Sequence, residues 1–440
     1  MKKIISRIKS NMYSTQIVKG SVISLFAVFL IGLINLLIRR ALAVNLTSTD
    51  YGFIYSIFSF LSIFIAIFDA GLGQSTVILI AQDNADKPLD RTSHIFGSFF
   101  TLRVMIAVML TLSLLLMADS LAEGYFKNPS GSGTLKIMCL WMGSMIVFGS
   151  LVSLFDGLKQ FALRQILFLT YYGTAFLIIM IAGSSITPQM AATAMVGGGT
   201  VSSIIFIFFI RKRYHFPLLI FGNALKAHFR RIADLSKWVS ISAAGLMIMF
   251  SMDTIMLTYY SNLDRVALYN IALPIMQVFL SIMLIFPQVI APIVTELWHL
   301  KKVRYLRFLV GITTLIIFAT MAANTVLVFF FKTRLIALIF NNTYLEAGTA
   351  LVILISGVPF YIVTQIHLTL LNGMGKQKKA SLLVVTGLGL NIVLNSILIP
   401  LADINGAALS TLISYIYLFL LSGIFFWQSS FYRYNPPYKK

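Results

Sequence analysis

The sequence predicts an all-α membrane protein with about 12 transmembrane helices in two six-helix lobes, and three observations support this fold class. They are the apolar composition, the number of long apolar stretches, and an internal repeat. Of the 440 residues, 58% are hydrophobic and only 11% are charged, and the mean hydropathy is +0.90. Soluble domains are about 45–50% apolar and about 25% charged. The composition therefore fits lipid as the surrounding solvent.

Twelve stretches can cross a membrane, because each offers the roughly 20 mostly apolar residues that a spanning helix needs. They are residues 20–40, 52–80, 95–118, 135–155, 161–184, 189–210, 238–260, 267–294, 308–331, 347–371, 380–401 and 404–427. The second stretch is unusually long and contains Asp69 followed by Ala-Gly-Leu-Gly, so we expect it to kink or to end early. An even number of spans places both ends of the chain on one side.

The positions of the basic residues predict the orientation in the membrane. With the N-terminus in the cytoplasm, 26 of the 34 Lys and Arg residues lie inside and seven lie outside, in agreement with the positive-inside rule. We therefore expect both termini in the cytoplasm. Residues 1–19 are interpreted as an interfacial segment leading into an uncleaved helix. The same distribution accounts for the net charge of +20 without a nucleic-acid partner, and loop 211–237 is expected to contact anionic lipids.

The two halves of the chain resemble each other at an offset of about 215 residues. LTSTDYGFIYSI at 46–57 resembles YSNLDRVALYNI at 260–271, FDG at 155–157 resembles LNG at 371–373, and Ala191-Ala192 matches Ala407-Ala408. Six spans in each half give both halves the same topology, so their pseudo-two-fold axis should run along the membrane normal. We expect an N-lobe of residues 1–225, a C-lobe of residues 226–440, and a central cavity between them.

Three longer segments carry a resemblance to a known family. They are residues 20–73, which begin GSVISLFAVFL; residues 247–272, MIMFSMDTIMLTYYSNLDRVALYNIA; and residues 370–415, which begin LLNGMGKQKKA. The chain resembles the polysaccharide/O-antigen flippases, a branch of the multidrug/oligosaccharidyl-lipid/polysaccharide exporter superfamily. The third to sixth spans match that pattern only loosely.

The resemblance implies a function and a set of partners. It implies a flippase that moves a polyprenyl-diphosphate-linked oligosaccharide, such as an O-antigen repeat unit of lipopolysaccharide biosynthesis, across the bacterial cytoplasmic membrane. It also implies alternating access, coupling to an ion rather than to ATP hydrolysis, and surrounding membrane lipids. Polysaccharide polymerase and assembly proteins are the expected protein partners.

Charged residues inside spans are costly, so each one is a candidate for function. Asp253 in the seventh span is the candidate ion-coupling carboxylate, or else a structural ion pair. Arg39 lies 214 residues before Asp253, so the repeat places the two at equivalent positions in opposite lobes. We hypothesise that they pair across the cavity; alternatively, Arg39 extends to the outer interface.

Further polar residues of the spans are weaker candidates. Arg103 would contact diphosphate or an acidic sugar, or extend to the cytoplasmic surface. Asp69 is a second ion-coupling candidate or a helix end. Asn35 and Gln277 are candidate cavity residues, among several uncharged polar side chains that could equally join helices: Gln74, Gln288, Asn324, Gln365, His367, Asn391 and Asn395.

Several classes of site are not predicted. The sequence has no P-loop motif for a nucleotide, its five histidines show no metal-ligand spacing, and no nucleophile motif suggests hydrolysis. We therefore expect no cofactor, no metal and no enzymatic activity.

Two other functions remain as alternatives. One is a multidrug/cation antiporter of the same superfamily. The other is a membrane-embedded polysaccharide polymerase or glycosyltransferase, although the short outer loops disfavour it. A peptidoglycan-precursor flippase is a further relative, but it usually has two more helices.

Overall fold

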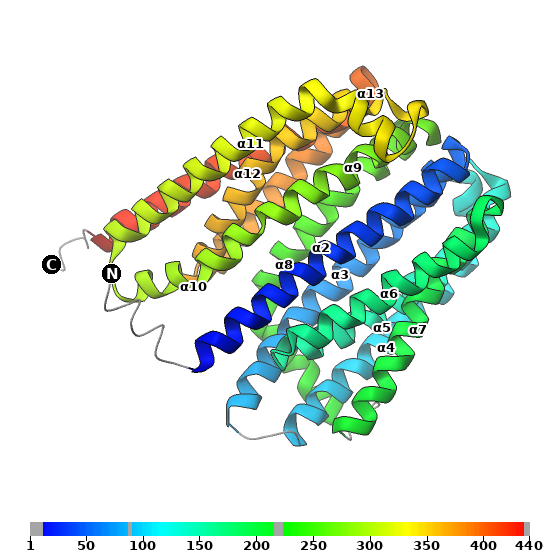
Figure 1. Cartoon of the computed structure of the whole chain (residues 1–440). Coiled ribbons are helices and arrows are strands. Elements are labelled where there is room, and N and C mark those ends of the chain that lie inside the picture. Colours follow the sequence, from blue (N-terminus) through cyan, green and yellow to red (C-terminus); the bar gives the residue numbers. More distant parts are fainter. Residues whose placement is uncertain (1–11, 87–89, 215–222, 435–440) are drawn as a thin grey trace. The chain divides into compact units, whose positions relative to one another are not determined.

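The computed structural model describes residues 12–86, 90–214 and 223–434, and every regular element in those ranges is a helix (Figure 1). The α-helices are α2 (Met12–Asn45), α3 (Ser48–Asp86), α4 (Asp90–Gly124), α5 (Ser132–Gly157), α6 (Phe161–Ala182), α7 (Pro188–Tyr214), α8 (Asn223–Tyr260), α9 (Leu263–Met283), α10 (Ile285–His299), α11 (Val303–Ile339), α12 (Ala347–Gly373) and α13 (Gln377–Tyr434). Three short 3-10 turns are η1 (Pro129–Gly131), η2 (Gly183–Ser185) and η3 (Asn342–Tyr344).

The described residues contain 11 helical segments long and apolar enough to cross a membrane. The last of them, Gln377–Gln428, has 52 residues and contains two crossings. Ala402 and Asp403 leave the helical conformation in its middle. Beyond them the chain folds back on itself. The contact between the two arms shows this, since a Cβ atom on Gly387 would lie 2.5 Å from the side chain of Leu418. The predicted spans 380–401 and 404–427 are thus the two arms of a helical hairpin, and the predicted all-helical membrane fold is confirmed.

Two predicted spans differ in detail from the observed helices. The span predicted at 267–294 is divided, since α9 ends at Met283 and α10 begins at Ile285. Pro287 explains the break, because it has no N–H to donate to the carbonyl of Met283 four residues earlier. The span predicted at 52–80 lies inside one continuous helix, α3, which runs past Asp69 to Asp86. The helix therefore does not end early, and the expected kink stays a prediction.

The chain forms two compact units whose segments alternate along the sequence. Unit 1 contains Met1–Ala41, Leu72–Leu116 and Lys136–Leu235, and unit 2 contains Leu42–Gly71, Met117–Leu135 and Ser236–Lys440. Unit 2 therefore includes the connections from α2 to α3 and from α4 to α5, in addition to most of the second half of the chain. The division into lobes of residues 1–225 and 226–440 follows topology rather than these contacts and stays a prediction.

Each unit has its own apolar core. In unit 1, aromatic and aliphatic side chains of α3 to α7 form one buried cluster, which includes Phe96, Phe155 and Phe206. In unit 2, α12 is the central helix and packs against α9, α10, α11 and α13. Of the most apolar 18-residue stretch of α12, 72% is buried, whereas only 17% of the corresponding stretch of α11 is buried. Because α11 exposes Leu315, Phe330 and other large apolar side chains, it is suited to face lipid.

Candidate functional site

A buried carboxylate in unit 2 is the best-defined polar site of the described chain. Asp253 of α8 is only 3% exposed and accepts hydrogen bonds from α9 and α13. Tyr269 donates its hydroxyl to Oδ2 over 2.6 Å, and the hydroxyl of Thr411 also donates to Oδ2. The amide nitrogens of Asn395 and Asn391 donate to Oδ1 over 2.8 and 3.3 Å. Four donors from two neighbouring helices thus surround one carboxylate.

The local folding of two helical hairpins brings these groups together. Ser261 and Asn262 connect α8 to α9, and the side chain of Asn262 caps α9 by accepting from the backbone N–H of Arg265. Asp253 and Tyr269 lie eight residues on either side of Ser261, so the antiparallel helices place them at the same depth. In α13, Asn391 and Asn395 are four residues apart and lie on one helix face.

The described partners of Asp253 are all neutral. They are a phenol, a hydroxyl and two amides, and no Lys or Arg side chain is among them. A charge inside a membrane span costs about 2.5–3.5 kcal/mol on insertion scales. Hydrogen bonds to charged groups return about 1.5–3 kcal/mol each. The amide and hydroxyl donors can therefore hold an ionised Asp253 in the span without a counter-ion.

Arg103 of α4 is the buried cation of unit 1, where its side chain is fully inaccessible. One guanidinium nitrogen donates to the backbone carbonyl of Ile146 over 3.2 Å, and the group lies 4.6 Å from the centre of the Phe99 ring. The bond to Ile146 joins α4 to α5, whereas Phe99 belongs to α4 itself. Arg103 is therefore held inside the helix packing of unit 1, and neither contact brings it to the surface.

The remaining candidates are not among the described hydrogen-bond partners of Asp253. Arg39 of α2 is buried in unit 1, whereas Asp253 belongs to unit 2, so their pairing stays a prediction. Asn35 on α2 and Gln277 on α9 are half-buried. Asp69 lies within α3, but its side chain is outside the described part of the structure. Their proposed roles in the cavity and in ion coupling stay predictions.

Comparison with known protein families shows to which family the chain belongs. The family described as polysaccharide biosynthesis protein matches residues 17–298, which is more than half of the sequence. The chain belongs to the polysaccharide biosynthesis protein family. The MatE family matches residues 239–397, which include α9 and α12. A curated relative, the uncharacterized membrane protein MJ1068 of Methanocaldococcus jannaschii, is 27% identical over 92% of this chain and 82% of its own length.

Solved structures share the fold of this family member. An inward-facing multidrug resistance MATE family transporter of the MOP superfamily superposes with a TM-score of 0.77 at 14% identity, covering 92% of this chain and 96% of its own. A MOP superfamily transporter from Pyrococcus furiosus gives 0.69 at 14% identity, with 95% and 96% covered. The resemblance predicted from sequence is confirmed, and the chain is a multi-pass membrane protein of a transporter superfamily.

The sequence singles out Asp253 but not its partners in this family member. Asn391 and Asn395 are two of several uncharged polar residues of the spans, and Tyr269 lies in the repeat segment 260–271. Thr411 has no distinguishing feature in the sequence. The spacing of Asn391 and Asn395 on one helix face was the available signal, but nothing in the sequence indicates that this face meets α8.

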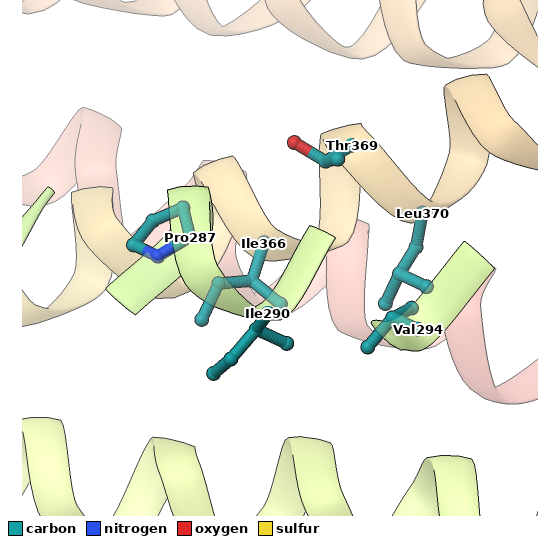
Figure 2. Close-up of a pocket in the computed structure, with 6 residues that line it drawn as sticks. All are labelled: Pro287, Ile290, Val294, Ile366, Thr369 and Leu370. Atoms are coloured by element: carbon teal, nitrogen blue, oxygen red, sulfur yellow. The ribbon is translucent and has the colours of Figure 1, made fainter. Parts of the chain in front are cut away.

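Figure 2 shows a small apolar pocket, and none of its six lining residues is a described partner of Asp253. Pro287, Ile290 and Val294 of α10 line one side, and Ile366, Thr369 and Leu370 of α12 line the other. Thr369 Oγ1 already donates to the backbone carbonyl of Gln365. The space is too small to hold a water molecule. The pocket is therefore a packing gap and not a ligand site.

Proposed function

We propose that this member of the polysaccharide biosynthesis protein family is an ion-coupled flippase for polyprenyl-diphosphate-linked oligosaccharide. The family match over residues 17–298 supports a role in polysaccharide export. The single structural observation that carries the coupling is the buried Asp253, which is held by neutral donors from α9 and α13. The expected setting is a bacterial cytoplasmic membrane with both termini in the cytoplasm.

Asp253 is the proposed coupling group, because its charge can be changed by the binding of one small ion. Its surroundings offer hydroxyl oxygens and amide oxygens in addition to the carboxylate, and the Oδ1 atom of Asn395 accepts no hydrogen bond in the described structure. Groups of three or more His, Cys, Asp or Glu are absent from the described residues. One carboxylate among neutral oxygens suits a proton or a monovalent cation better than a divalent metal, which favours several carboxylates.

The proposed cargo has an anionic diphosphate, a polar glycan and a lipid tail. The buried basic residues of unit 1, Arg39 and Arg103, are the candidates to interact with the anionic group. Arginine suits this role, because its planar guanidinium donates in pairs to phosphate oxygens. Arg103 would have to exchange its bond to the Ile146 carbonyl for one to the cargo.

Multidrug export is the second candidate function. The match of the MatE family to residues 239–397 and the likeness to MATE transporter structures favour it. A cationic drug would bind to a carboxylate rather than to an arginine. The two candidates therefore differ in the residues they require: Asp253 alone for a cationic drug, and Arg39 or Arg103 in addition for a diphosphate.

Deletion of the gene in its source organism separates the two candidates. A flippase deletion accumulates oligosaccharide on its lipid carrier at the cytoplasmic leaflet and loses surface polysaccharide. Complementation with Arg103→Lys is then expected to restore less surface glycan than the unchanged chain. Normal surface glycan together with greater sensitivity to cationic compounds would instead support drug export and contradict the flippase proposal.

A further inference from the structure

Matching segments of the two repeats pack against each other inside unit 2. We call the contact of residues 43–56 with residues 254–271 the outer seal, since the expected orientation places it on the outside. The hydroxyl of Thr49 donates to Asp264 over 2.8 Å, and the hydroxyls of Ser56 and Thr258 are 2.5 Å apart. A Cβ atom on Gly52 would lie 1.8 Å from the carbonyl oxygen of Leu263. The two backbones therefore touch.

Two further contacts flank the outer seal. Tyr125, after α4, donates its hydroxyl to the backbone carbonyl of Ile255 over 2.8 Å. Tyr344 of η3 donates to the carbonyl of Ala43 over 3.0 Å and its ring lies 6.2 Å from that of Tyr51. First-repeat segments are thus bonded to second-repeat segments at several points. These bonds must break together if the two repeats separate on this side.

Two neighbouring hydrogen bonds between α8 and α9 connect the outer seal to Asp253. Tyr269 donates to Asp253, and the amide of the next residue, Asn270, donates to Thr254 over 3.2 Å. The backbone carbonyl of Asn270 in turn accepts the hydroxyl of Tyr51, from the first repeat, over 3.4 Å. Adjacent residues of α9 therefore make the two contacts: Tyr269 bonds to the carboxylate of Asp253, and Asn270 bonds to Tyr51 of the outer seal.

We infer that Tyr269 and Asn270 are positioning residues that couple the charge of Asp253 to closure of the outer seal. This inference rests on the proposed ion coupling at Asp253, but not on the identity of the cargo. An ionised carboxylate attracts the Tyr269 hydroxyl more strongly than a neutral group does. The negative charge of Asp253 thus holds α9 against α8 in the position in which the Asn270 carbonyl bonds to Tyr51. Neutralisation of Asp253 by a bound ion weakens the bond from Tyr269 and favours opening of the outer seal.

A cysteine pair across the outer seal measures its closure. The short side chains of Thr49 and Asp264 touch, so Thr49→Cys with Asp264→Cys lies within reach of a disulfide. The only native cysteine, Cys139, is buried and is replaced by Ala. The rate of disulfide formation with a mild oxidant is measured in membrane vesicles without cargo. Ser242→Cys with Ser381→Cys is the matched control, because that pair joins α8 to α13 within the second repeat over 3.0 Å.

The variants form a double-mutant cycle of Asp253→Asn and Tyr269→Phe in both cysteine backgrounds. Asp253→Asn mimics the neutral carboxyl and is expected to slow disulfide formation across the seal about tenfold, with the control pair unchanged. In the Tyr269→Phe background, Asp253→Asn should have little further effect. Asn270→Ala is expected to slow the seal pair in the same way, while leaving the rate insensitive to Asp253→Asn.

The outcomes separate coupling from general damage. Equal slowing of the seal pair and the control pair would mean that Asp253→Asn disturbs the fold of the second repeat, and this would overturn the inference. An effect of Asp253→Asn that persists undiminished in Tyr269→Phe would also overturn it. If the seal responds as expected but the deletion strain keeps its surface glycan, the proposed cargo fails and the coupling stands.

Discussion

At the scale of single residues, Asp253 carries the strongest prediction. Asp253→Asn keeps the shape of the side chain but removes the charge, so hydrogen bonds to an ionised group worth about 1.5–3 kcal/mol each become neutral ones. Ion-coupled transport should fall roughly 10- to 100-fold. Glu123→Gln, the same change at an exposed position of α4, is the matched control. Transport is measured as surface glycan in a complemented deletion strain, normalised to the amount of protein in the membrane.

Full activity of Asp253→Asn would show that the carboxylate is only structural. The amide of Asn should keep most of the hydrogen bonds around position 253. If the variant is nevertheless lost from the membrane, the charge of Asp253 is needed for folding, and its role is again structural. The site illustrates what sequence can reveal about a residue. A lone carboxylate in an apolar stretch is conspicuous because of its cost. Thr411 and Tyr269 are ordinary residues of membrane helices, and only the hairpins of α8–α9 and α13 show that they meet Asp253.

Gly52 gives a second prediction at this scale. Gly52→Ala places a methyl group where the Leu263 carbonyl and, at 3.1 Å, the Ala267 nitrogen already lie, so α3 and α9 must move apart. Overpacking of this kind costs about 1–3 kcal/mol. The midpoint of thermal unfolding in detergent should therefore fall. Gly32→Ala in α2 meets no atom within 4 Å and should be neutral or stabilising. Equal midpoints for the two variants would contradict the backbone contact at Gly52.

At the scale of elements, the outer seal predicts a reversible block of transport. Oxidation of the Thr49→Cys and Asp264→Cys pair ties α3 to α9 and should abolish transport, because alternating access requires that these segments separate. Reduction should restore it. Oxidation of the Ser242→Cys and Ser381→Cys pair ties α8 to α13 within one repeat and should leave transport unchanged. Unimpaired transport with a fully oxidised seal pair would show that the seal does not open during the cycle.

The elements also show where sequence prediction ends. Apolar stretches predict the crossings that the described residues form, since a bilayer imposes both length and polarity on each helix. Prolines within the eighth span, Pro287 among them, indicate a bend or break there, but not the residue at which α9 ends, because Pro287 acts on a carbonyl four residues earlier. The hairpin of α13 turns at Asp403, whose φ of 50° is uncommon for a residue other than glycine. Its carboxylate bonds to Ser261 and Arg265, and these contacts hold the turn.

At the scale of the whole molecule, the compact units do not follow the order of the sequence. The repeat at an offset of about 215 residues indicated two equivalent halves. A repeat describes ancestry and topology, whereas a compact unit describes contacts in one conformation. Residues 42–71 are grouped with the second half because the outer seal joins them to it, and residues 117–135 because Tyr125 bonds to Ile255. Sequence cannot reveal this grouping, because a repeat does not specify which segments of its two halves are in contact.

The orientation of the chain is the last prediction, and two lysines test it as a matched pair. Lys127 and Lys159 are both exposed loop residues with a positive φ, at 53° and 57°, so cysteine is under similar strain at either position. With Cys139→Ala as background, Lys127→Cys should react with a membrane-impermeant maleimide in intact cells. Lys159→Cys should react only after the membrane is opened. The reverse pattern would place the termini outside and would turn the proposed outer seal into a cytoplasmic one. The proposed role of Asp253 would be unchanged, because the hydrogen bonds of Tyr269 to Asp253 and of Asn270 to Thr254 both lie within unit 2.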